Sequence, residues 1–227
     1  MLLHLKNILT PDELHSARRL LGSDAPWIDG RSSAGDQALA KKQNEQVAQD
    51  SENARQLQAL VLAALHREPL FFSAALPKKI FNPLFNRYSG DSNFYGTHTD
   101  GAVVHSRATS QSVRSDISCK LFLAEPADYD SGELLIQEAQ RERSIKLAAG
   151  DMVHYPGSTL HQVAPATRGA RLASFFWIES MVRSTEQRQL QFDMDMALLQ
   201  LRGQGDEPAV VQLTGTCHNL LRMWADT

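Results

Sequence analysis

The tripeptide His98-Thr99-Asp100 places an imidazole and a carboxylate two positions apart in a β-prone stretch of the chain. Residues i and i+2 of an extended strand point to the same face, so both side chains can reach one metal ion. A second imidazole, His161, follows 63 positions later, just after a turn-forming Pro156-Gly157 pair. Two histidines and one carboxylate are the ligand set of the non-haem Fe(II) facial triad, whose open positions serve oxygen chemistry. The three residues therefore predict a metal centre.

Arg171 lies ten positions after His161 and opens the apolar run from Leu172 to Ile178. An arginine that enters a core strand needs an anion, and its planar guanidinium binds a carboxylate through two hydrogen bonds. We expect its strand to pair beside that of His161, across a turn at Arg168-Gly169. A His-x-Asp pair alone often arises by chance, and His161 or Arg171 alone fits a packed histidine or a surface arginine. Their combination in one segment favours the metal site.

Short β-prone runs separated by turn formers must position these side chains. About eight such strands are typical of a double-sheet jelly roll, the architecture that includes the cupins. Within one of them, apolar residues alternate with Ser118 and Lys120, as in a strand with one buried face. The polar residues 101–115 are interpreted as a mobile loop that directly follows the first two candidate ligands in the sequence. The expected strands are 74–76, 84–88, 96–100, 117–123, 133–137, 144–147, 152–155, 161–163 and 172–179.

Helical patterns precede the strands. A capping-box sequence at Thr10 starts a helix that Gly22 ends. Residues 51–68 predict an amphipathic helix that Pro69 stops. Between these helices, residues 30–50 are interpreted as an extended or irregular segment.

The helical period returns after Ser180, with expected helices at 185–202 and 212–224 that either cover the barrel or form a homodimer contact. The predicted fold is mainly β with flanking helices. It has a double-stranded β-helix (jelly roll, cupin-like) core with N-terminal helices and a C-terminal helical extension. The expected domains are an N-terminal helical support region at 1–78, the jelly-roll core at 79–180 and the C-terminal extension at 181–227.

Composition narrows the class of protein. The chain of 227 residues is 42% hydrophobic and 22% charged, which are ordinary values for a globular protein with a packed core. A net charge of −3 and a pI near 6.2 argue against nucleic-acid binding, and no apolar run reaches membrane-spanning length. The N-terminus lacks a signal-peptide pattern, and Cys119 and Cys217 form neither a metal-type pair nor a disulfide framework. These features predict a cytoplasmic protein without a nucleic-acid or membrane partner.

Several short motifs surround the candidate ligands: Asn86-Arg87-Tyr88, Gly96-Thr97-His98-Thr99-Asp100, Asp116-Ile117-Ser118, Gly132-Glu133-Leu134, Gly150-Asp151, Leu160-His161-x-Val163 and Arg171. Together they resemble the Fe(II)/2-oxoglutarate-dependent oxygenases. Within that superfamily the chain looks most like the bacterial PKHD-type hydroxylases, relatives of prolyl and lysyl hydroxylases. The resemblance covers residues 80–180 at the level of motifs. It extends weakly to residues 34–38 and to the C-terminal helices.

The resemblance implies that His98, Asp100 and His161 hold Fe(II) and that Arg171 binds the distal carboxylate of 2-oxoglutarate. It also implies O2 as a cosubstrate, a hydrogen bond from Tyr88 to 2-oxoglutarate and ascorbate as a reductant. The implied reaction hydroxylates an unactivated C–H bond and releases succinate and CO2. Kinship to prolyl and lysyl hydroxylases points to an amino-acid or peptide side chain, or another small molecule, as substrate. This inference is one of analogy, because a fold alone does not fix function.

One position departs from the commonest pattern of these oxygenases, which places a hydroxyl residue two positions after the arginine. Ala173 stands there, and Ser174 follows one position later, so the resemblance leaves a serine contact to the cosubstrate unassigned. The carboxylate of Asp100 counts against a halogenase, in which a small residue takes that place so that chloride can bind.

Two other functions stay open. A cupin-like metalloenzyme without 2-oxoglutarate, such as an extradiol-type dioxygenase or an isomerase, would leave Arg171 without an obvious anion. A non-catalytic iron or 2-oxoglutarate sensor would bind its ligands without turnover. A nucleic-acid demethylase is disfavoured because no basic aromatic groove is visible. The remaining histidines are poor candidates for the site: His154 is expected to be packed or to support a ligand, and His105 lies in the loop, where little favours a contact with substrate.

Overall fold

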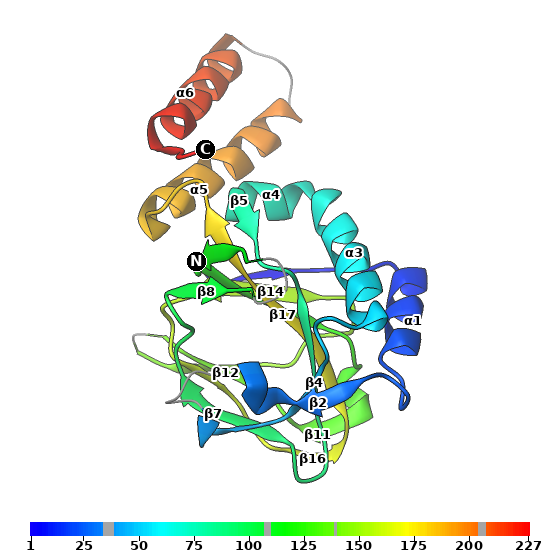
Figure 1. The fold of residues 1–227 in the computed structure, drawn as a ribbon. Helices are drawn as coiled ribbons and strands as arrows, with labels where there is room; N and C mark the ends of the chain where they lie inside the picture. The colour runs from blue at the N-terminus through cyan, green and yellow to red at the C-terminus, as the bar shows by residue number, and fades with distance from the viewer. Residues whose placement is uncertain (34–38, 107–109, 139, 204–207) are drawn as a thin grey trace.

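Two antiparallel β-sheets face each other to form the core of the protein (Figure 1). The computed structural model describes residues 1–33, 39–106, 110–138, 140–203 and 208–227. The larger sheet runs in the order β1 (Leu3–Leu5), β14 (Met152–Pro156), β10 (Ile117–Phe122), β17 (Arg171–Ser180), β6 (Leu84–Tyr88), β4 (Glu45–Val47) and β2 (Trp27–Asp29), with β5 (Pro77–Ile80) also paired to β17. The smaller sheet runs in the order β13 (Glu142–Ile145), β12 (Leu134–Gln137), β15 (His161–Val163), β7 (Phe94–His98) and β3 (Lys42–Gln43). This confirms the predicted jelly-roll core.

The central strand β10 shows how the larger sheet divides its two faces. Ile117, Cys119 and Leu121 pack into the hydrophobic cluster that the sheet shares with the helices. The alternate residues, Ser118 and Lys120, are also buried, because they face the smaller sheet rather than water. The polar face of this strand therefore belongs to the interior of the jelly roll.

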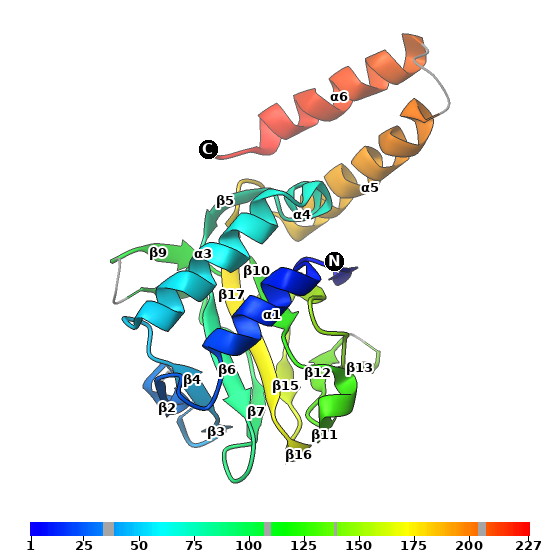
Figure 2. The ribbon, with the colours of Figure 1, turned by 90° about the vertical axis from the view of Figure 1, so that its right-hand side faces the viewer.

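Three N-terminal helices cover the outer face of the larger sheet: α1 (Pro11–Leu20), α3 (Glu52–His66) and α4 (Pro69–Ala75) (Figure 2). The predicted capping box is present in α1, where Thr10 Oγ accepts from the Glu13 amide and the Glu13 carboxylate accepts from the Thr10 amide. The predicted strand at 74–76 is wrong. Pro69 ends α3 but also starts α4, because its fixed φ suits the first helical position and Glu68 caps the Leu70 amide.

Residues 101–115 are not simply a loop. Their described part contains β8 (Val103–His105) and β9 (Ser112–Arg114), which pair as an antiparallel hairpin. Val113 is fully buried beside Phe81, Leu84 and Phe175, so apolar packing holds the hairpin against the core. The mostly polar composition of the segment did not indicate this packing.

The segment 30–50 is extended over much of its length, as predicted, but it contributes more than a connection. After a short 3-10 helix at Gly30–Ser33, β3 joins the smaller sheet and β4 joins the larger one. The N-terminal region, expected to be a helical support, thus also supplies strands to both sheets. Residues 34–38, where the weak resemblance was noted, lie outside the described residues.

The predicted pairing of the Arg171 and His161 strands is wrong. β15 pairs with β12 and β7 in the smaller sheet, whereas β17 pairs with β10, β6 and β5 in the larger sheet. The connection forms a separate strand, β16 (Ala166–Gly169), paired with β11 (Tyr129–Ser131), which follows a second 3-10 helix at Pro126–Asp128. Through this connection the chain crosses to the opposite sheet, so His161 and Arg171 approach the same pocket from facing sheets.

The C-terminal helices α5 (Thr185–Arg202) and α6 (Pro208–Trp224) form a pair that extends away from the sheets (Figures 1 and 2). α5 rests on α4, where Ser73 donates a hydrogen bond to Asp195. The pair does not cover the barrel, and its exposed apolar residues include Leu190, Leu199, Val211 and Met223. The homodimer contact through these helices stays a prediction. Within the described residues, every helix is too short or too polar to cross a bilayer.

Gly169 ends β16 and determines where β17 and Arg171 begin. Its φ is +69°, and a Cβ there would lie 2.0 Å from the Asp128 carbonyl oxygen. Gly90 also has a positive φ, +53°, but a Cβ there would meet nothing within 4 Å. We expect Gly90→Ala to lower the free energy of unfolding by about 1 kcal/mol and Gly169→Ala by roughly 3 kcal/mol. A left-handed backbone destabilises alanine at both positions, whereas steric overlap with the Asp128 carbonyl oxygen destabilises only Gly169→Ala. Urea unfolding of both variants measures this difference, and equal losses would contradict the role of the Asp128 contact.

Candidate metal centre

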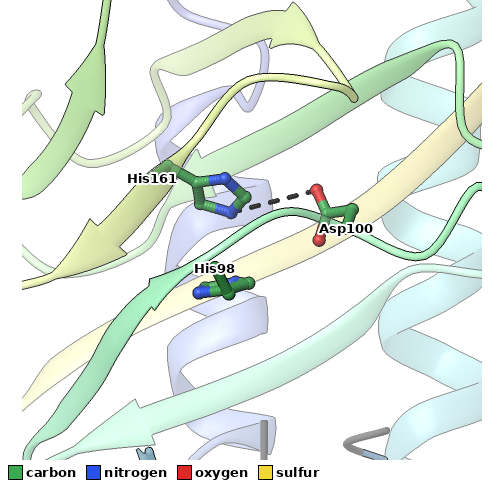
Figure 3. A group of neighbouring side chains, drawn as sticks. All are labelled: His98, Asp100 and His161. Carbon is green, nitrogen blue, oxygen red and sulfur yellow. Dashed lines mark ion pairs between the residues drawn. The ribbon is translucent and has the colours of Figure 1, made fainter. Parts of the chain in front are cut away.

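Two neighbouring strands of the smaller sheet bring the candidate ligands together. His98 ends β7 and lies in register with His161, the first residue of β15. Asp100 follows β7, and Figure 3 shows its carboxylate directed toward the His161 ring. The three donor atoms lie within 4.8 Å of one another, and His161 Nε2 is 3.9 Å from Asp100 Oδ2. Two ligand atoms that are each about 2.1 Å from one ion can be that far apart, so this donor pair fits a shared metal.

Backbone hydrogen bonds determine which nitrogen of each histidine faces the site. His98 Nδ1 lies 2.7 Å from the Gly96 carbonyl oxygen, and His161 Nδ1 lies 3.0 Å from that of Thr159. Because a carbonyl oxygen only accepts hydrogen bonds, each Nδ1 carries the proton and each Nε2 keeps its lone pair. The buried His161 Nε2 has no hydrogen-bond partner among the described residues. An orphaned imidazole lone pair held in this way suits a metal ligand.

Burial and nearby charges set the protonation of the three groups. Burial and the adjacent His161 lower the pKa of His98 to about 3, and burial lowers the pKa of His161. Burial alone would raise the pKa of Asp100, but the Lys120 charge, His161 and a hydrogen bond donated by Ser118 hold it below its ordinary value. The site thus presents two neutral imidazoles and one carboxylate at neutral pH, the forms in which these groups bind metals.

Aromatic side chains hold both imidazole rings in place. Tyr95 stacks on His98 with ring centres 3.6 Å apart and an interplanar angle of 16°. Tyr155 meets His161 edge to face at 5.1 Å. The imidazoles therefore have little freedom to turn, which favours a preorganised ligand set.

Arg171 reaches the same pocket from the opposite sheet. It lies in register with Tyr88 of β6, and its guanidinium is 5.3 Å from the Tyr88 ring centre and 5.2 Å from that of Phe122. Arg171 is only 1% exposed, and within the described part of the chain its Nε and Nη2 have no hydrogen-bond partner. Leaving a buried guanidinium unpaired is costly, so these surroundings suit a bound anion.

The three candidate ligands and Arg171 line one pocket, which is partly open to solvent. Residues without a role in the sequence analysis also line it: Lys42, Asn44, Asn86, Lys120, Phe175 and Trp177. The sequence did contain a signal for Lys120, because strand alternation places it on the same face of β10 as Ser118 and opposite the apolar face. Lys42 and Asn44 had none, because nothing in the segment 30–50 indicates that it crosses between the sheets.

Both lysines of the pocket lie close to the Phe175 ring. The Lys120 ammonium is 5.0 Å from its centre and the Lys42 ammonium 5.9 Å. Burial, followed by the charge of Lys120, lowers the pKa of Lys42 to about 7. Burial likewise lowers the pKa of Lys120, although the Asp100 carboxylate opposes that shift. The pocket therefore concentrates positive charge around a single carboxylate.

Tyr88 and Ser174 lie on opposite faces of the larger sheet. Tyr88 is buried and lines the pocket, with its hydroxyl 3.5 Å from Asn86 Nδ2. Ser174 lies in register with Phe85 and Leu121, whose side chains belong to the helix-facing cluster. Strand alternation thus turns Ser174 away from any ligand bound beside Arg171.

The other histidines lie outside the pocket. His154 is buried on β14, in register with Leu3 and Cys119, and burial lowers its pKa to about 3. This agrees with its expected packed role. His105 is exposed on β8, and its Nδ1 lies 2.8 Å from Ser112 Oγ across the hairpin.

Two family models match different parts of the chain. Residues 83–179 match the 2OG-Fe(II) oxygenase superfamily, and residues 186–226 match the PKHD-type hydroxylase C-terminal domain. The chain is 57% identical over 228 residues to a PKHD-type hydroxylase of Polaromonas sp., with 100% of both chains covered. It is equally similar, 57% over 228 residues with 100% of both chains covered, to a PKHD-type hydroxylase of Variovorax paradoxus.

Solved structures share the fold at much lower identity. A prolyl hydroxylase from Trichoplax adhaerens, in complex with a hypoxia inducible factor oxygen degradation domain peptide fragment, matches with a TM-score of 0.55 and 12% identity. The match covers 78% of this chain and 83% of that one. At this identity the similarity shows a common fold alone.

Proposed function

The chain belongs to the PKHD-type hydroxylases of the 2OG-Fe(II) oxygenase superfamily, and on that basis we propose that it hydroxylates an unactivated C–H bond while converting 2-oxoglutarate to succinate and CO2. The family implies Fe(II), 2-oxoglutarate and O2 as cofactor and cosubstrates. The observation that carries the proposal is the buried guanidinium of Arg171, which lies in the same pocket as the triad and whose Nε and Nη2 have no hydrogen-bond partner among the described residues. An anion bound there would lie between a cation and a metal centre.

His98, Asp100 and His161 would hold the iron, which supplies the oxygen-activating chemistry when it is bound. The chain's own contribution is positioning. The Gly96 and Thr159 carbonyls orient the two imidazoles, and Ser118 anchors the carboxylate of Asp100. These outer contacts fix the ligand atoms before the metal arrives.

Arg171 would bind the distal carboxylate of 2-oxoglutarate through its fork of N–H donors, and Tyr88 would donate a hydrogen bond beside it. Nε and Nη2 of Arg171, which have no hydrogen-bond partner within the described ranges, offer two parallel donors to one carboxylate. Burial of both side chains removes competing water, which strengthens such charged hydrogen bonds.

For the substrate we propose an amino-acid or peptide side chain. The similar Trichoplax adhaerens protein is a prolyl hydroxylase in complex with a peptide fragment, which supports this class. The β8–β9 hairpin, joined to Asp100 by two residues, packs against Phe175 and Trp177 of the pocket wall and is well placed to border a bound chain.

Anaerobic addition of Fe(II) and then 2-oxoglutarate to the wild-type protein is expected to produce the visible charge-transfer band of the iron–keto-acid chelate. Admission of O2 should then release succinate, slowly without substrate and faster with the correct one. Absorption spectroscopy and succinate quantification measure the two steps. Their order separates binding from turnover.

The same experiment distinguishes the other functions. Iron binding without any response to 2-oxoglutarate would refute the proposal and favour a cupin-like metalloenzyme. A chelate that yields no succinate with any amino-acid or peptide substrate would favour a sensor. A control without Fe(II) accounts for succinate that forms independently of the site.

A further inference from the structure

Lys120 lies between the two ends of the pocket. Its neighbours on the inward face of β10 are Ser118, which hydrogen-bonds Asp100, and Phe122, whose ring lies under the Arg171 guanidinium. Across the sheet it lies in register with Phe175 of β17. Its side chain therefore occupies the level between the triad and Arg171, where a ligand that joins the two must pass.

The Lys120 ammonium is a second buried cation without a matching anion. Lys120 is 9% exposed. In the described part of the chain its ammonium contacts the Phe175 ring and is not paired with a carboxylate. A cation–π contact recovers only a fraction of the cost of removing an ammonium from water. The charge of Asp100 favours the protonated form of Lys120, but the Asp100 carboxylate accepts a hydrogen bond from Ser118 and lies 3.9 Å from His161 Nε2.

The charge of Lys120 acts on the metal end of the pocket. Its charge helps to lower the pKa values of His98, Asp100 and His161. Of the cations that line the pocket, which also include Lys42, Lys120 lies toward the triad and Arg171 at the far end. A dicarboxylate with one charge at each end matches this spacing of charge.

We propose that Lys120 is a second cationic anchor for 2-oxoglutarate and that it binds the carboxylate of the keto-acid end, beside the metal. The inference rests on the proposed function, in which 2-oxoglutarate binds with its distal carboxylate on Arg171. Lys120 then pairs with the second carboxylate of the same molecule. Lys120 acts here as a binding and positioning residue. Its ammonium neutralises and orients the keto acid, while Arg171 fixes the opposite end.

Lys120→Met, which keeps the length of the side chain and removes the charge, tests this assignment. We expect 2-oxoglutarate to bind about 10- to 100-fold more weakly in the anaerobic Fe(II) titration, the loss typical of one charged hydrogen bond. Lys79→Met makes the same change on β5, where the lysine pairs with Glu179 outside the pocket, and should bind like the wild type. Lys120→Gln provides a second neutral variant if the methionine does not fold.

The choice of keto acid shows which carboxylate Lys120 binds. 2-Oxobutyrate has the keto-acid end but lacks the distal carboxylate. Loss of Lys120 should weaken its binding by the same factor as for 2-oxoglutarate, because the contacted group is present in both. An effect confined to 2-oxoglutarate would overturn the assignment to the keto-acid end.

The thermal midpoint of the protein without 2-oxoglutarate gives a readout independent of activity. Removing a buried, unmatched cation should raise the midpoint of Lys120→Met above that of the wild type. A lowered midpoint would count against an unmatched charge. If the wild type forms no chelate, the proposed function fails; if both proteins bind 2-oxoglutarate equally, only the role of Lys120 fails.

Discussion

His161→Ala is expected to weaken Fe(II) binding by more than about 100-fold and to abolish succinate formation. Loss of a residue that merely supports a metal ligand costs about 10- to 100-fold in affinity, and loss of the ligand itself costs at least as much. His161 is buried, and its Nε2 has no other partner among the described residues, so another side chain cannot replace it without moving. Anaerobic calorimetry with Fe(II) measures the affinity directly.

His105→Ala is the matched control for this variant. It removes the same type of side chain from the exposed β8–β9 hairpin, outside the residues that line the pocket. Its Fe(II) affinity should equal that of the wild type. Undiminished Fe(II) binding by His161→Ala would show that the metal is held elsewhere.

Arg171→Met is expected to weaken 2-oxoglutarate binding by at least about 100-fold while Fe(II) affinity stays unchanged. Two charged hydrogen bonds contribute about 3 to 5 kcal/mol together, and methionine removes both while it keeps an unbranched apolar side chain. The effect should appear in the KM for 2-oxoglutarate more than in kcat. Anaerobic titration of the iron–keto-acid band and steady-state kinetics measure the two quantities.

Arg168→Met provides the control, three residues earlier in the chain. Arg168 is exposed on β16 and pairs with Asp130, so its loss should leave 2-oxoglutarate binding unaltered. 2-Oxobutyrate gives a second comparison, since it lacks the carboxylate that Arg171 would bind. If Arg171→Met weakens both keto acids equally, Arg171 does not recognise the distal carboxylate.

Strong local patterns predicted much of this fold. The capping box at Thr10 and the period of residues 185–202 identified α1 and α5, because both signals lie within one element. The apolar-polar alternation likewise identified β10, and β-prone runs bounded by turn formers identified β6 and β14. The prediction for the residues after Pro69 was wrong because proline can either end or begin a helix. Here the cap that Glu68 supplies lets Pro69 begin one.

Predictions that depended on pairing between distant segments were less successful. The spacing of His161 and Arg171 suggested adjacent strands, whereas the chain crosses to the opposite sheet between them. That crossing makes the pocket possible, since the two residues approach it from facing walls. Likewise, Lys120 fitted a solvent-facing position until the smaller sheet covered it. Sequence alternation identifies the two faces of a strand, but not what lies opposite each face.

The short run from Lys42 to Val47 links the two sheets, with β3 in one, β4 in the other and Asn44 between them. Its partners, β7 and β6, come much later in the chain, and the pocket also needs Trp177. Contacts so far apart in sequence form slowly, and an emerging chain cannot make them. During synthesis on the ribosome β4 can pair only with the earlier strand β2, and the edges that β3 and β4 present to β7 and β6 must wait unpaired. The metal can therefore be loaded only into a nearly complete polypeptide, and a prematurely terminated product would expose unpaired strand edges to proteases and chaperones.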